Sequence, residues 1–405
     1  MEKNLLVAQS GGPTAVINAS LLGVIQEAWK QKTVHQIYGS MHGIDGLFND
    51  QIIDLKKINP SDLEKLYYTP SAALGSVRRC LPHDLSHPLY LQLLQQFQKY
   101  QIHYFLYIGG NDSMDTVLKL NQFFKKVNYP CLVLGIPKTI DNDLVITDHA
   151  PGYGSAIKYI ANTIQELHFD ISCYQRGRVN IVEIMGRDSG WLTAGSKLAC
   201  LNQAGPDLIY LPEVAFDEKS FLKKVQQLYQ KQQQVLICVS EGIKDKTGKY
   251  VMEQSAYFED NDVFGHLQLG GVAKVLSHLV KKELNLPVRA IELNLCQRCA
   301  SHFLSKTDVT EAYQAGVQAV QLILNGHTGE MIAFKRVNQQ PYQITYACIP
   351  IEQIANQVSY IPSSWIQDDC DLNEKFIHYA LPLIQGEITL PYHNGLIDFY
   401  SIKYR

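Results

Sequence analysis

Directly after an apolar run at 130–135, the sequence reads Ile136-Pro137-Lys138-Thr139-Ile140-Asp141-Asn142-Asp143-Leu144. The apolar run predicts a buried strand, so the polar cluster emerges at the carboxyl end of a strand, where open α/β sheets bind their ligands. A cation, a hydroxyl and two carboxylates can neutralise phosphate oxygens, orient an alcohol and remove its proton. The cluster therefore predicts a phosphoryl transferase, although Asp-Asn-Asp after a strand is also ordinary turn chemistry.

Two further junctions repeat the arrangement of strand, glycines and helix. An apolar run at 103–108 leads into Gly109-Gly110-Asn111-Asp112-Ser113, and residues 5–8 lead into Gln9-Ser10-Gly11-Gly12-Pro13-Thr14. Glycines at such a junction let the backbone approach a phosphate, whose charge the helix N-terminus favours. Three such junctions at one sheet edge predict a phosphate-binding site.

Strand and helix patterns alternate along most of the chain. The predicted strands lie near 4–9, 103–108, 130–136, 178–185, 207–211, 234–239 and 288–294, and the predicted helices near 14–30, 113–127, 154–168, 190–200, 217–232, 268–284 and 308–324. This alternation predicts an α/β protein with parallel, doubly wound sheets. The segment after about 326 contains a strand-like run at 343–349 and is otherwise assigned no chemistry.

Several motifs together carry a family resemblance. They are Gly11-Gly12, Leu74-Gly75-Ser76-Val77-Arg78, Gly109 to Ser113, Pro137 to Asp143, Met185-Gly186-Arg187 and Gln297-Arg298. In order and approximate spacing this set resembles the phosphofructokinase family over about the first three hundred residues. The resemblance implies two doubly wound, mainly parallel α/β domains with the active site in the cleft between them. The donor-binding domain is expected at 1–149 plus about 290–325, and the sugar-phosphate domain at 150–289 plus about 326–405.

Two positions bear on the choice of phosphoryl donor. Family members that use ATP usually have glycine where this chain has Asp112 and Lys138, whereas members that use pyrophosphate usually have aspartate and lysine. The Asp112 carboxylate would oppose the α-phosphate of a nucleotide, and Lys138 would balance the charge of pyrophosphate. The resemblance thus implies reversible phosphoryl transfer from pyrophosphate to the 1-hydroxyl of fructose 6-phosphate, a step of glycolysis.

The same resemblance assigns roles to individual residues. Asp141 would be the general base, helped by Lys138, Asp112, Thr139 and Asp143. The implied donor-binding residues are Gly11, Gly12, Arg78, Gly110 and Asn111, with Asn111 also the expected ligand of Mg2+. The implied substrate-binding residues are Thr139, Ile140, Asp141, Arg178, Met185, Gly186, Arg187, Glu241, Arg289 and Arg298.

Arg178 and Arg187 stand at opposite ends of one predicted strand. The length of that strand would keep both from gripping one phosphate at the same sheet edge. The resemblance implies that Arg178 and Arg289 reach the 6-phosphate of the sugar across a subunit interface. A homodimer or homotetramer with shared sites is therefore expected.

Three departures from the family pattern affect the metal and the acceptor. Asn111 stands where many members have a metal-associated aspartate, and a neutral amide is the weaker ligand for Mg2+, so Asp143 and the pyrophosphate oxygens are expected to contribute. Cys299-Ala300 replaces the usual two glycines after Gln297-Arg298, and Leu295 stands where an aromatic residue or histidine often contacts the sugar. Sedoheptulose 7-phosphate is therefore a second candidate acceptor.

Composition limits the class of protein. The chain has 405 residues, 46% of them hydrophobic, and a net charge of −3, which gives no electrostatic basis for nucleic-acid binding. No apolar run approaches the roughly 18 residues of a membrane helix, so a cytoplasmic, membrane-free protein is expected. Nine cysteines, an odd number, favour reduced thiols. Cys296 and Cys299 have the spacing of a zinc or redox pair, but no second pair follows at a suitable distance.

Three alternatives stay open. An ATP-dependent phosphofructokinase would share the fold and the acceptor, and Asp112 and Lys138 oppose it. The Gly-Gly-Asn-Asp turn also occurs in lipid and nicotinamide nucleotide kinases, which would not require the downstream arginines. A catalytically silent regulatory subunit would keep the fold, and the presence of Asp141, Asp143 and Lys138 argues against it.

Overall fold

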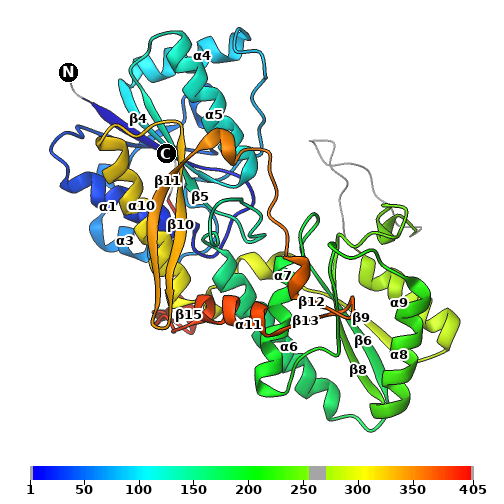
Figure 1. The fold of residues 1–405 in the computed structure, drawn as a ribbon. Coiled ribbons are helices and arrows are strands. Elements are labelled where there is room, and N and C mark those ends of the chain that lie inside the picture. The colour runs from blue at the N-terminus through cyan, green and yellow to red at the C-terminus, as the bar shows by residue number, and fades with distance from the viewer. Residues whose placement is uncertain (1–2, 255–270, 403–405) are drawn as a thin grey trace. The chain divides into compact units, whose positions relative to one another are not determined.

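The structure is a computed structural model that describes residues 3–254 and 271–402. The chain divides into two compact units, neither of which is continuous in sequence. Unit 1 consists of Met1–Ser155, Arg298–Gln357 and Gln385–Arg405, and unit 2 consists of Ala156–Gln297 and Val358–Ile384. Each unit is built on its own β-sheet (Figure 1).

The sheet of unit 1 has seven strands. In spatial order they are β11 (Tyr342–Pro350), β10 (Glu330–Gln339), β5 (Leu132–Pro137), β4 (Ile102–Gly109), β1 (Asn4–Gln9), β2 (Ile37–Ser40) and β3 (Ile52–Asp54). The five strands from β10 to β2 are parallel, and β11 and β3 pair antiparallel at the two edges. The carboxyl ends of β1, β4 and β5 therefore meet at one edge of the sheet.

Both faces of this sheet are covered by helices. Leu5 and Val7 of β1 pack on the side of α1 (Ile17–Lys30) and α10 (Lys306–Leu324). The alternate residues Leu6 and Ala8 pack on the side of α4 (Pro88–Lys99) and α5 (Asn111–Lys126). Because successive side chains of a strand point to opposite faces, this alternation shows a sheet buried on both sides. The predicted doubly wound α/β fold is confirmed.

The sheet of unit 2 is smaller and entirely parallel, with the strand order β7 (Leu208–Tyr210), β8 (Gln234–Ser240), β6 (Arg178–Ile184) and β9 (Val288–Glu292). One face packs against α8 (Glu218–Gln232) and α9 (Val272–Leu284) around Val179, Ile181 and Phe221. The remaining elements of the two units are short, apart from α6: α2 (Asp45–Phe48), α3 (Pro60–Glu64), α6 (Tyr153–Ser172), α7 (Trp191–Ala194), α11 (Glu374–Ala380), β12 (Ile366–Gln367), β13 (Asp371–Leu372), β14 (Tyr392–His393) and β15 (Leu396–Ile397).

The predicted strands and helices agree with the structure except in a few places. The helix expected at 190–200 is a single α-helical turn, α7, continued by a 3-10 helix at Gly195–Asn202. Gly195, a poor helix former, stands at the change and packs closely against Ile157. The helix expected at 268–284 begins at Val272, after Gly271 at φ +96°, and residues 268–270 lie outside the described part of the chain.

The division into units differs from the expected domains mainly after residue 326. Glu330 and Met331 of β10 pair with Leu134 and Gly135 of β5, so β10 and β11 extend the sheet of unit 1. Only Val358–Ile384 of the C-terminal segment belongs to unit 2. The return to unit 1 comes at Arg298 rather than near 290, because β9 pairs with β6 inside unit 2.

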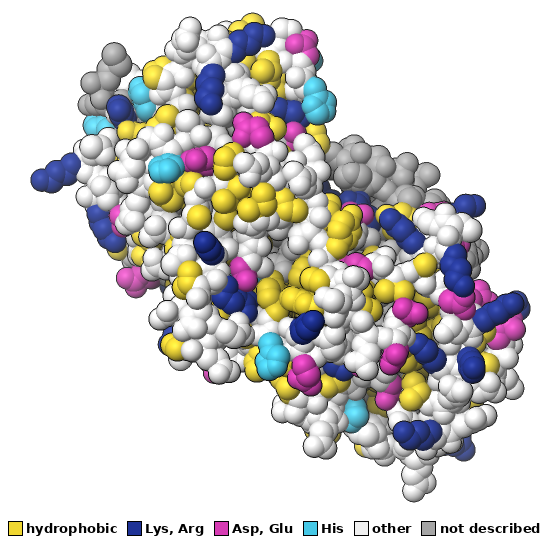
Figure 2. Space-filling model, viewed as in Figure 1, with side chains coloured by type: hydrophobic (Ala, Val, Ile, Leu, Met, Phe, Trp, Pro, Cys, Tyr) yellow, Lys and Arg dark blue, Asp and Glu magenta, His cyan; other side chains and the backbone are white. Residues whose placement is uncertain are grey.

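The surface carries mixed charge. On the face shown in Figure 2, the Lys and Arg side chains among the coloured residues are interspersed with Asp and Glu. None of the helices in the described part of the chain combines the length and apolar composition needed to cross a membrane.

Two glycines let α1 and α10 approach each other closely. A Cβ atom added at Gly23 would lie 2.1 Å from the Tyr313 carbonyl oxygen, and one added at Gly316 would lie 2.1 Å from that of Ser20. We expect Gly23→Ala to lower the free energy of unfolding by about 1–3 kcal/mol, because the two helix backbones must move apart. Urea unfolding followed by circular dichroism measures this change.

The matched control is Gln92→Ala on the exposed side of α4. That substitution should leave the free energy of unfolding within about 0.5 kcal/mol of wild type. Equal stability of Gly23→Ala and wild type would contradict the close helix crossing.

Candidate active site

The first candidate element is the Gly11–Gly12 turn after β1. Gly11 has φ +78°, a conformation that favours glycine. Its N–H donates to the Val77 carbonyl oxygen at 3.0 Å, and the Ser76 hydroxyl donates to the Gly11 carbonyl oxygen. The segment that leads to Arg78 therefore holds this turn in place.

Lys138 joins the carboxyl ends of three strands. Its N–H donates to the carbonyl oxygen of Gly109 at 3.0 Å, and its Nζ donates to that of Gly12 at 2.6 Å. Only 2% of Lys138 is exposed. Burial lowers the pKa of Lys138 to about 8, although the carboxylates of Asp141 and Asp143 favour its charged form. A buried ammonium group thus lies directly at the glycine turn.

Two arginines lie beside the same turn. A Cβ atom added at Gly12 would be 3.2 Å from Nη1 of Arg298 and 3.9 Å from Nη2 of Arg78. Burial lowers the pKa of Arg298, and the neighbouring Arg78 lowers it further. Like charges gather here because the turn has no side chains, and an anion would relieve their repulsion. The structure thereby places Arg298, expected among the substrate-binding residues, next to the donor turn.

The acidic loop follows Lys138. The N–H of Asp141 donates to the Thr139 hydroxyl at 3.1 Å, and the Asn142 side chain accepts from the N–H of Ala150 at 3.0 Å. These bonds fix the loop, in which Asn142 has φ +55° and Ile140 is buried. Burial raises the pKa of the Asp143 carboxyl, and the charge of Asp141 raises it further.

Asn111 and Asp112 form the first turn of α5, with Gly110 as its N-cap. The Asn111 side chain accepts a hydrogen bond from the N–H of Asn356 at 2.7 Å and donates one to the carbonyl oxygen of Gln357 at 2.5 Å. The metal-ligand role of Asn111 stays a prediction, since its amide already binds the backbone. Asp112 is exposed at the helix N-terminus.

A second group of predicted residues lies where β6 and β8 of unit 2 end. The Gly186 N–H donates to Oε1 of Glu241 at 3.1 Å, and the Met185 N–H donates to Oε1 of Gln297 at 3.2 Å. Gly186 has φ +137°, which turns the chain toward Arg187. Met185, Gly186, Arg187 and Glu241 therefore lie together at this end of the sheet, and their role in sugar binding stays a prediction.

Arg178 and Arg289 lie elsewhere on the same sheet. Arg178 begins β6, and Arg289 pairs with Asn180 on the neighbouring strand β9. Both line a cavity of about 350 Å3 together with Arg176. Since β6 rises about 3.3 Å per residue, roughly 20 Å separates Arg178 from Ile184, the last residue of the strand before the cluster at Gly186. The two groups of residues cannot contact one phosphate within unit 2.

The comparisons with known proteins show the family of the chain. Residues 4–323 match the family described as Phosphofructokinase. The chain belongs to the phosphofructokinase family.

Relatives within the phosphofructokinase family match almost the whole chain. A Xanthomonas campestris protein named pyrophosphate–fructose 6-phosphate 1-phosphotransferase is 40% identical over 99% of this chain and 96% of its own length. A Halomonas elongata protein of the same name is 38% identical over 98% and 95%. The crystal structure of the pyrophosphate-dependent phosphofructokinase from Nitrosospira multiformis superposes with a TM-score of 0.90 at 36% identity, covering 100% of this chain and 98% of that one.

The sequence patterns did not predict one buried cluster of charged side chains. Nδ1 of His149 lies 2.8 Å from a carboxylate oxygen of Asp148, and Nε2 lies 2.7 Å from one of Glu311. Arg336 binds Asp148, and Tyr342 donates to Glu311 at 2.8 Å. Glu311 is 162 positions from His149, so no local motif signals the contact. The cluster joins the segment after the acidic loop to α10 and the β10–β11 hairpin.

This cluster predicts a pH dependence of stability. Burial opposes the charge of His149, but the carboxylates of Glu311 and Asp148 outweigh it and raise the pKa of His149 to about 9. A raised pKa of His149 in the folded protein stabilises the fold. The stabilisation is complete below the pKa of the unfolded state, about 6.5, and it disappears as the pH rises through about 9. We expect the free energy of unfolding to fall by on the order of 3 kcal/mol between pH 6.5 and 9.5 from this group.

Urea unfolding of wild type and His149→Gln across this pH range checks the expectation. His149→Gln should be less stable at pH 6.5 and should show a smaller loss between pH 6.5 and 9.5. Identical pH profiles of the two proteins would contradict a charged His149.

Proposed function

We propose that the protein transfers a phosphoryl group from pyrophosphate to the 1-hydroxyl of fructose 6-phosphate, giving fructose 1,6-bisphosphate and phosphate. The observation that carries the proposal is the buried ammonium group of Lys138, bonded to the Gly12 carbonyl oxygen beside Arg78 and Arg298. Three cations around a glycine turn suit a small, highly charged anion. The names of the Xanthomonas and Halomonas relatives support the same donor and acceptor.

Asp112 supports pyrophosphate over a nucleotide. Its carboxylate stands in the first turn of α5, where the partial positive charge of the helix N-terminus would otherwise favour a phosphate. A nucleotide bound by its terminal phosphates carries a third, anionic phosphate, which this carboxylate would repel. Pyrophosphate ends before that point, so it avoids the repulsion.

The acidic loop supplies the groups for the transfer. Asp141 takes the proton of the sugar 1-hydroxyl, whose oxygen then forms a bond to phosphorus while the bridging P–O bond of pyrophosphate breaks. Phosphate leaves with the electron pair of that bond. Lys138 stabilises the charge on the transferred group, and Thr139 orients the loop through its bond to the Asp141 N–H.

The residues of the loop also fit a divalent cation. Oδ1 of Asp143 is buried and has no hydrogen-bond partner among the described residues. Such an oxygen suits a hard cation, so we assign Asp143 as the main protein ligand of Mg2+, with Asn111 contributing at most through its remaining lone pair. Bound Mg2+ would neutralise pyrophosphate oxygens.

The sugar phosphate is assigned to residues of unit 2. Met185, Gly186, Arg187 and Glu241 would bind the sugar, because backbone groups and a carboxylate can recognise its hydroxyls. Arg178 and Arg289 would bind the 6-phosphate of a sugar held by a neighbouring subunit, since they lie at a different part of the sheet. Exposed Phe169 and Tyr174 near this cavity support a subunit interface, and hence a homodimer or homotetramer. The cytoplasmic location stays a prediction.

Two alternatives are disfavoured by particular residues. An ATP-dependent enzyme conflicts with Asp112 and the buried Lys138. A silent subunit conflicts with the ordered loop that presents Asp141 and Asp143. Sedoheptulose 7-phosphate stays a second candidate acceptor because the exposed Leu295 stands where family members often have an aromatic residue or histidine that contacts the sugar.

The donor is tested by measuring fructose 1,6-bisphosphate formation from fructose 6-phosphate and Mg2+ with pyrophosphate or ATP. We expect wild type to use pyrophosphate at least a hundredfold better than ATP, expressed as kcat/KM. In Lys138→Gly, kcat/KM for pyrophosphate should fall at least a hundredfold, because the buried cation at the donor turn is gone. Asp112→Gly should raise kcat/KM for ATP.

Asp112→Asn is the matched control, since it removes the charge and keeps the size of the side chain. A gain with ATP in both Asp112 variants would assign the exclusion of ATP to charge, and a gain only in Asp112→Gly would assign it to bulk. Unchanged pyrophosphate activity in Lys138→Gly would contradict the proposed donor site.

The general base is tested with Asp141→Ser. We expect kcat to fall by about 10²–10⁴ while KM for fructose 6-phosphate changes only a few-fold, because proton removal is lost and sugar binding is kept. Steady-state kinetics with pyrophosphate as donor measures both constants. The control is Asp84→Ser, which removes an exposed carboxylate far from the loop in sequence. A kcat near that of wild type would exclude Asp141 as the base.

A further inference from the structure

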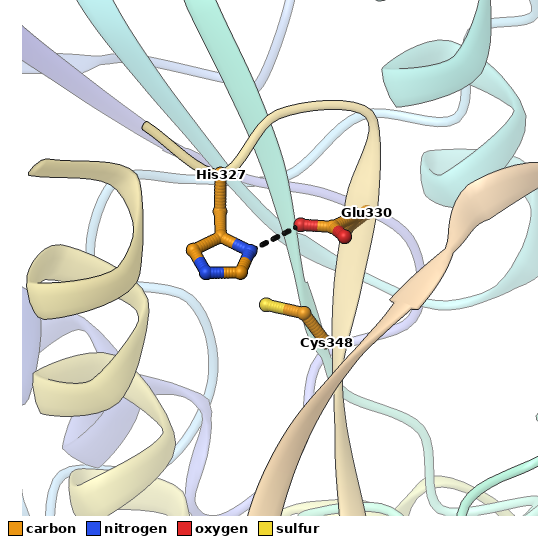
Figure 3. A group of neighbouring side chains, drawn as sticks. All are labelled: His327, Glu330 and Cys348. Atoms are coloured by element: carbon orange, nitrogen blue, oxygen red, sulfur yellow. Dashed lines mark hydrogen bonds and ion pairs between the residues drawn. The ribbon is translucent and has the colours of Figure 1, made fainter. Parts of the chain in front are cut away.

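Three side chains with metal-binding atoms meet in unit 1, apart from every residue assigned to pyrophosphate or the sugar. They are His327, Glu330 and Cys348, whose ligand atoms all lie within 4.8 Å of one another. Figure 3 shows the three side chains pointing toward a common space, with the imidazole of His327 bonded to the carboxylate of Glu330. They offer nitrogen, oxygen and sulfur, one atom each.

The position of His327 is fixed by the end of α10. The His327 N–H donates to the carbonyl oxygen of Leu322 at 3.1 Å, and the Gly326 N–H donates to that of Ile323 at 3.1 Å. Gly326 has φ +95°, so these bonds form a Schellman motif with glycine in the left-handed position. The helix end therefore delivers His327 at a defined place rather than on a free loop.

The positions of Glu330 and Cys348 are fixed by the register of the β10–β11 hairpin. Glu330 pairs with Pro350, and Ile332 pairs with Cys348. Cys348 is thus two residues from the direct partner of Glu330, which makes the two a diagonal pair on one face of the sheet. All three side chains are attached to backbone that regular hydrogen bonds hold.

The geometry suits a tetrahedral ion after small side-chain movements. Zn–N and Zn–O bonds of about 2.0–2.2 Å and Zn–S bonds of about 2.3 Å require the ligand atoms to lie roughly 3.3–3.8 Å apart. The His327 nitrogen and the Glu330 oxygen, now 2.7 Å apart, would separate slightly, and the thiol would move closer. The side chain of His327 is 40% exposed and that of Glu330 is 23% exposed, so an ion can enter from solvent.

We propose that His327, Glu330 and Cys348 form a binding site for a Zn2+ ion, with water as the fourth ligand. A thiolate and an imidazole select a borderline-soft ion such as Zn2+ and disfavour Mg2+, so this site does not compete for the Mg2+ of the proposed reaction. The ion would tie the end of α10 to the β10–β11 hairpin at the edge of the sheet.

Binding requires the thiol to lose its proton. Without an ion, burial and the neighbouring Glu330 carboxylate raise the pKa of Cys348 to about 12, so the sulfur is a neutral thiol. On binding, the S–H bond breaks, a Zn–S bond forms with the sulfur electron pair, and the proton passes to the buffer. No oxidation is involved. In the bound state the charge of Zn2+ offsets the repulsion between the Cys348 thiolate and the Glu330 carboxylate.

The test is a titration of the chelator-treated protein with Co2+, which takes tetrahedral sites of this type and gives a thiolate-to-Co2+ absorption band. We expect one Co2+ per chain and displacement of the band by one equivalent of Zn2+. Cys348→Ser should lose the band, and His327→Gln should weaken Co2+ binding at least tenfold. Cys200→Ser, which replaces another half-buried thiol in unit 2, is the matched control and should keep the band.

Two further measurements separate the site from scattered surface binding. Calorimetric titrations with Zn2+ in two buffers of different ionisation enthalpy should show about one proton released by wild type and Cys200→Ser at pH 7. Zn2+ should raise the melting temperature of these two proteins but not that of Cys348→Ser. A wild-type protein without the Co2+ band, or a band that persists in folded Cys348→Ser, would overturn the proposal.

Discussion

The structure of the candidate site depends on one interaction, the hydrogen bond from the buried Lys138 ammonium to the Gly12 carbonyl oxygen. The backbone N–H of Lys138 donates to the Gly109 carbonyl oxygen, so this single residue connects the ends of β1, β4 and β5. A buried charge is costly without partners, and the carboxylates of Asp141 and Asp143 supply part of the compensation. The parallel order of the strands is what brings these groups from separate segments to one edge.

At this edge of the sheet, the charged side chains of the protein do not fully compensate one another. Lys138, Arg78 and Arg298 gather at a turn that has no side chains, and burial and the neighbouring arginines lower the pKa of Lys138, as burial and Arg78 lower that of Arg298. Asp143 is held buried with an oxygen that lacks a partner among the described residues. Pyrophosphate would compensate the three cations, and a divalent cation would bind that oxygen of the Asp143 carboxylate. These two charges connect the geometry to the proposed reaction.

Sequence patterns predicted the candidate site because its residues follow strands directly, as Gly11, Gly110 and Lys138 do. They also placed most strands and helices, since the periods of apolar residues are long and regular there. They missed side chains that only the fold brings together, such as His149 with Glu311 and His327 near Cys348. They also missed the pairing of β10 with β5 that places residues 330–350 in unit 1. Helix α4 was not predicted, although its sequence indicates a helix: Pro88 stands at the start, and Tyr90, Leu93 and Phe97 form one apolar face.

The central claim is that the Gly11–Gly12 turn and its three cations bind pyrophosphate and that Asp112 keeps nucleotides away. The most direct measurement is a pair of calorimetric titrations of the wild-type protein, without sugar, with magnesium pyrophosphate and with magnesium ATP. The account predicts that pyrophosphate binds at least tenfold more tightly than ATP. Equal affinities, or tighter binding of ATP, would contradict it.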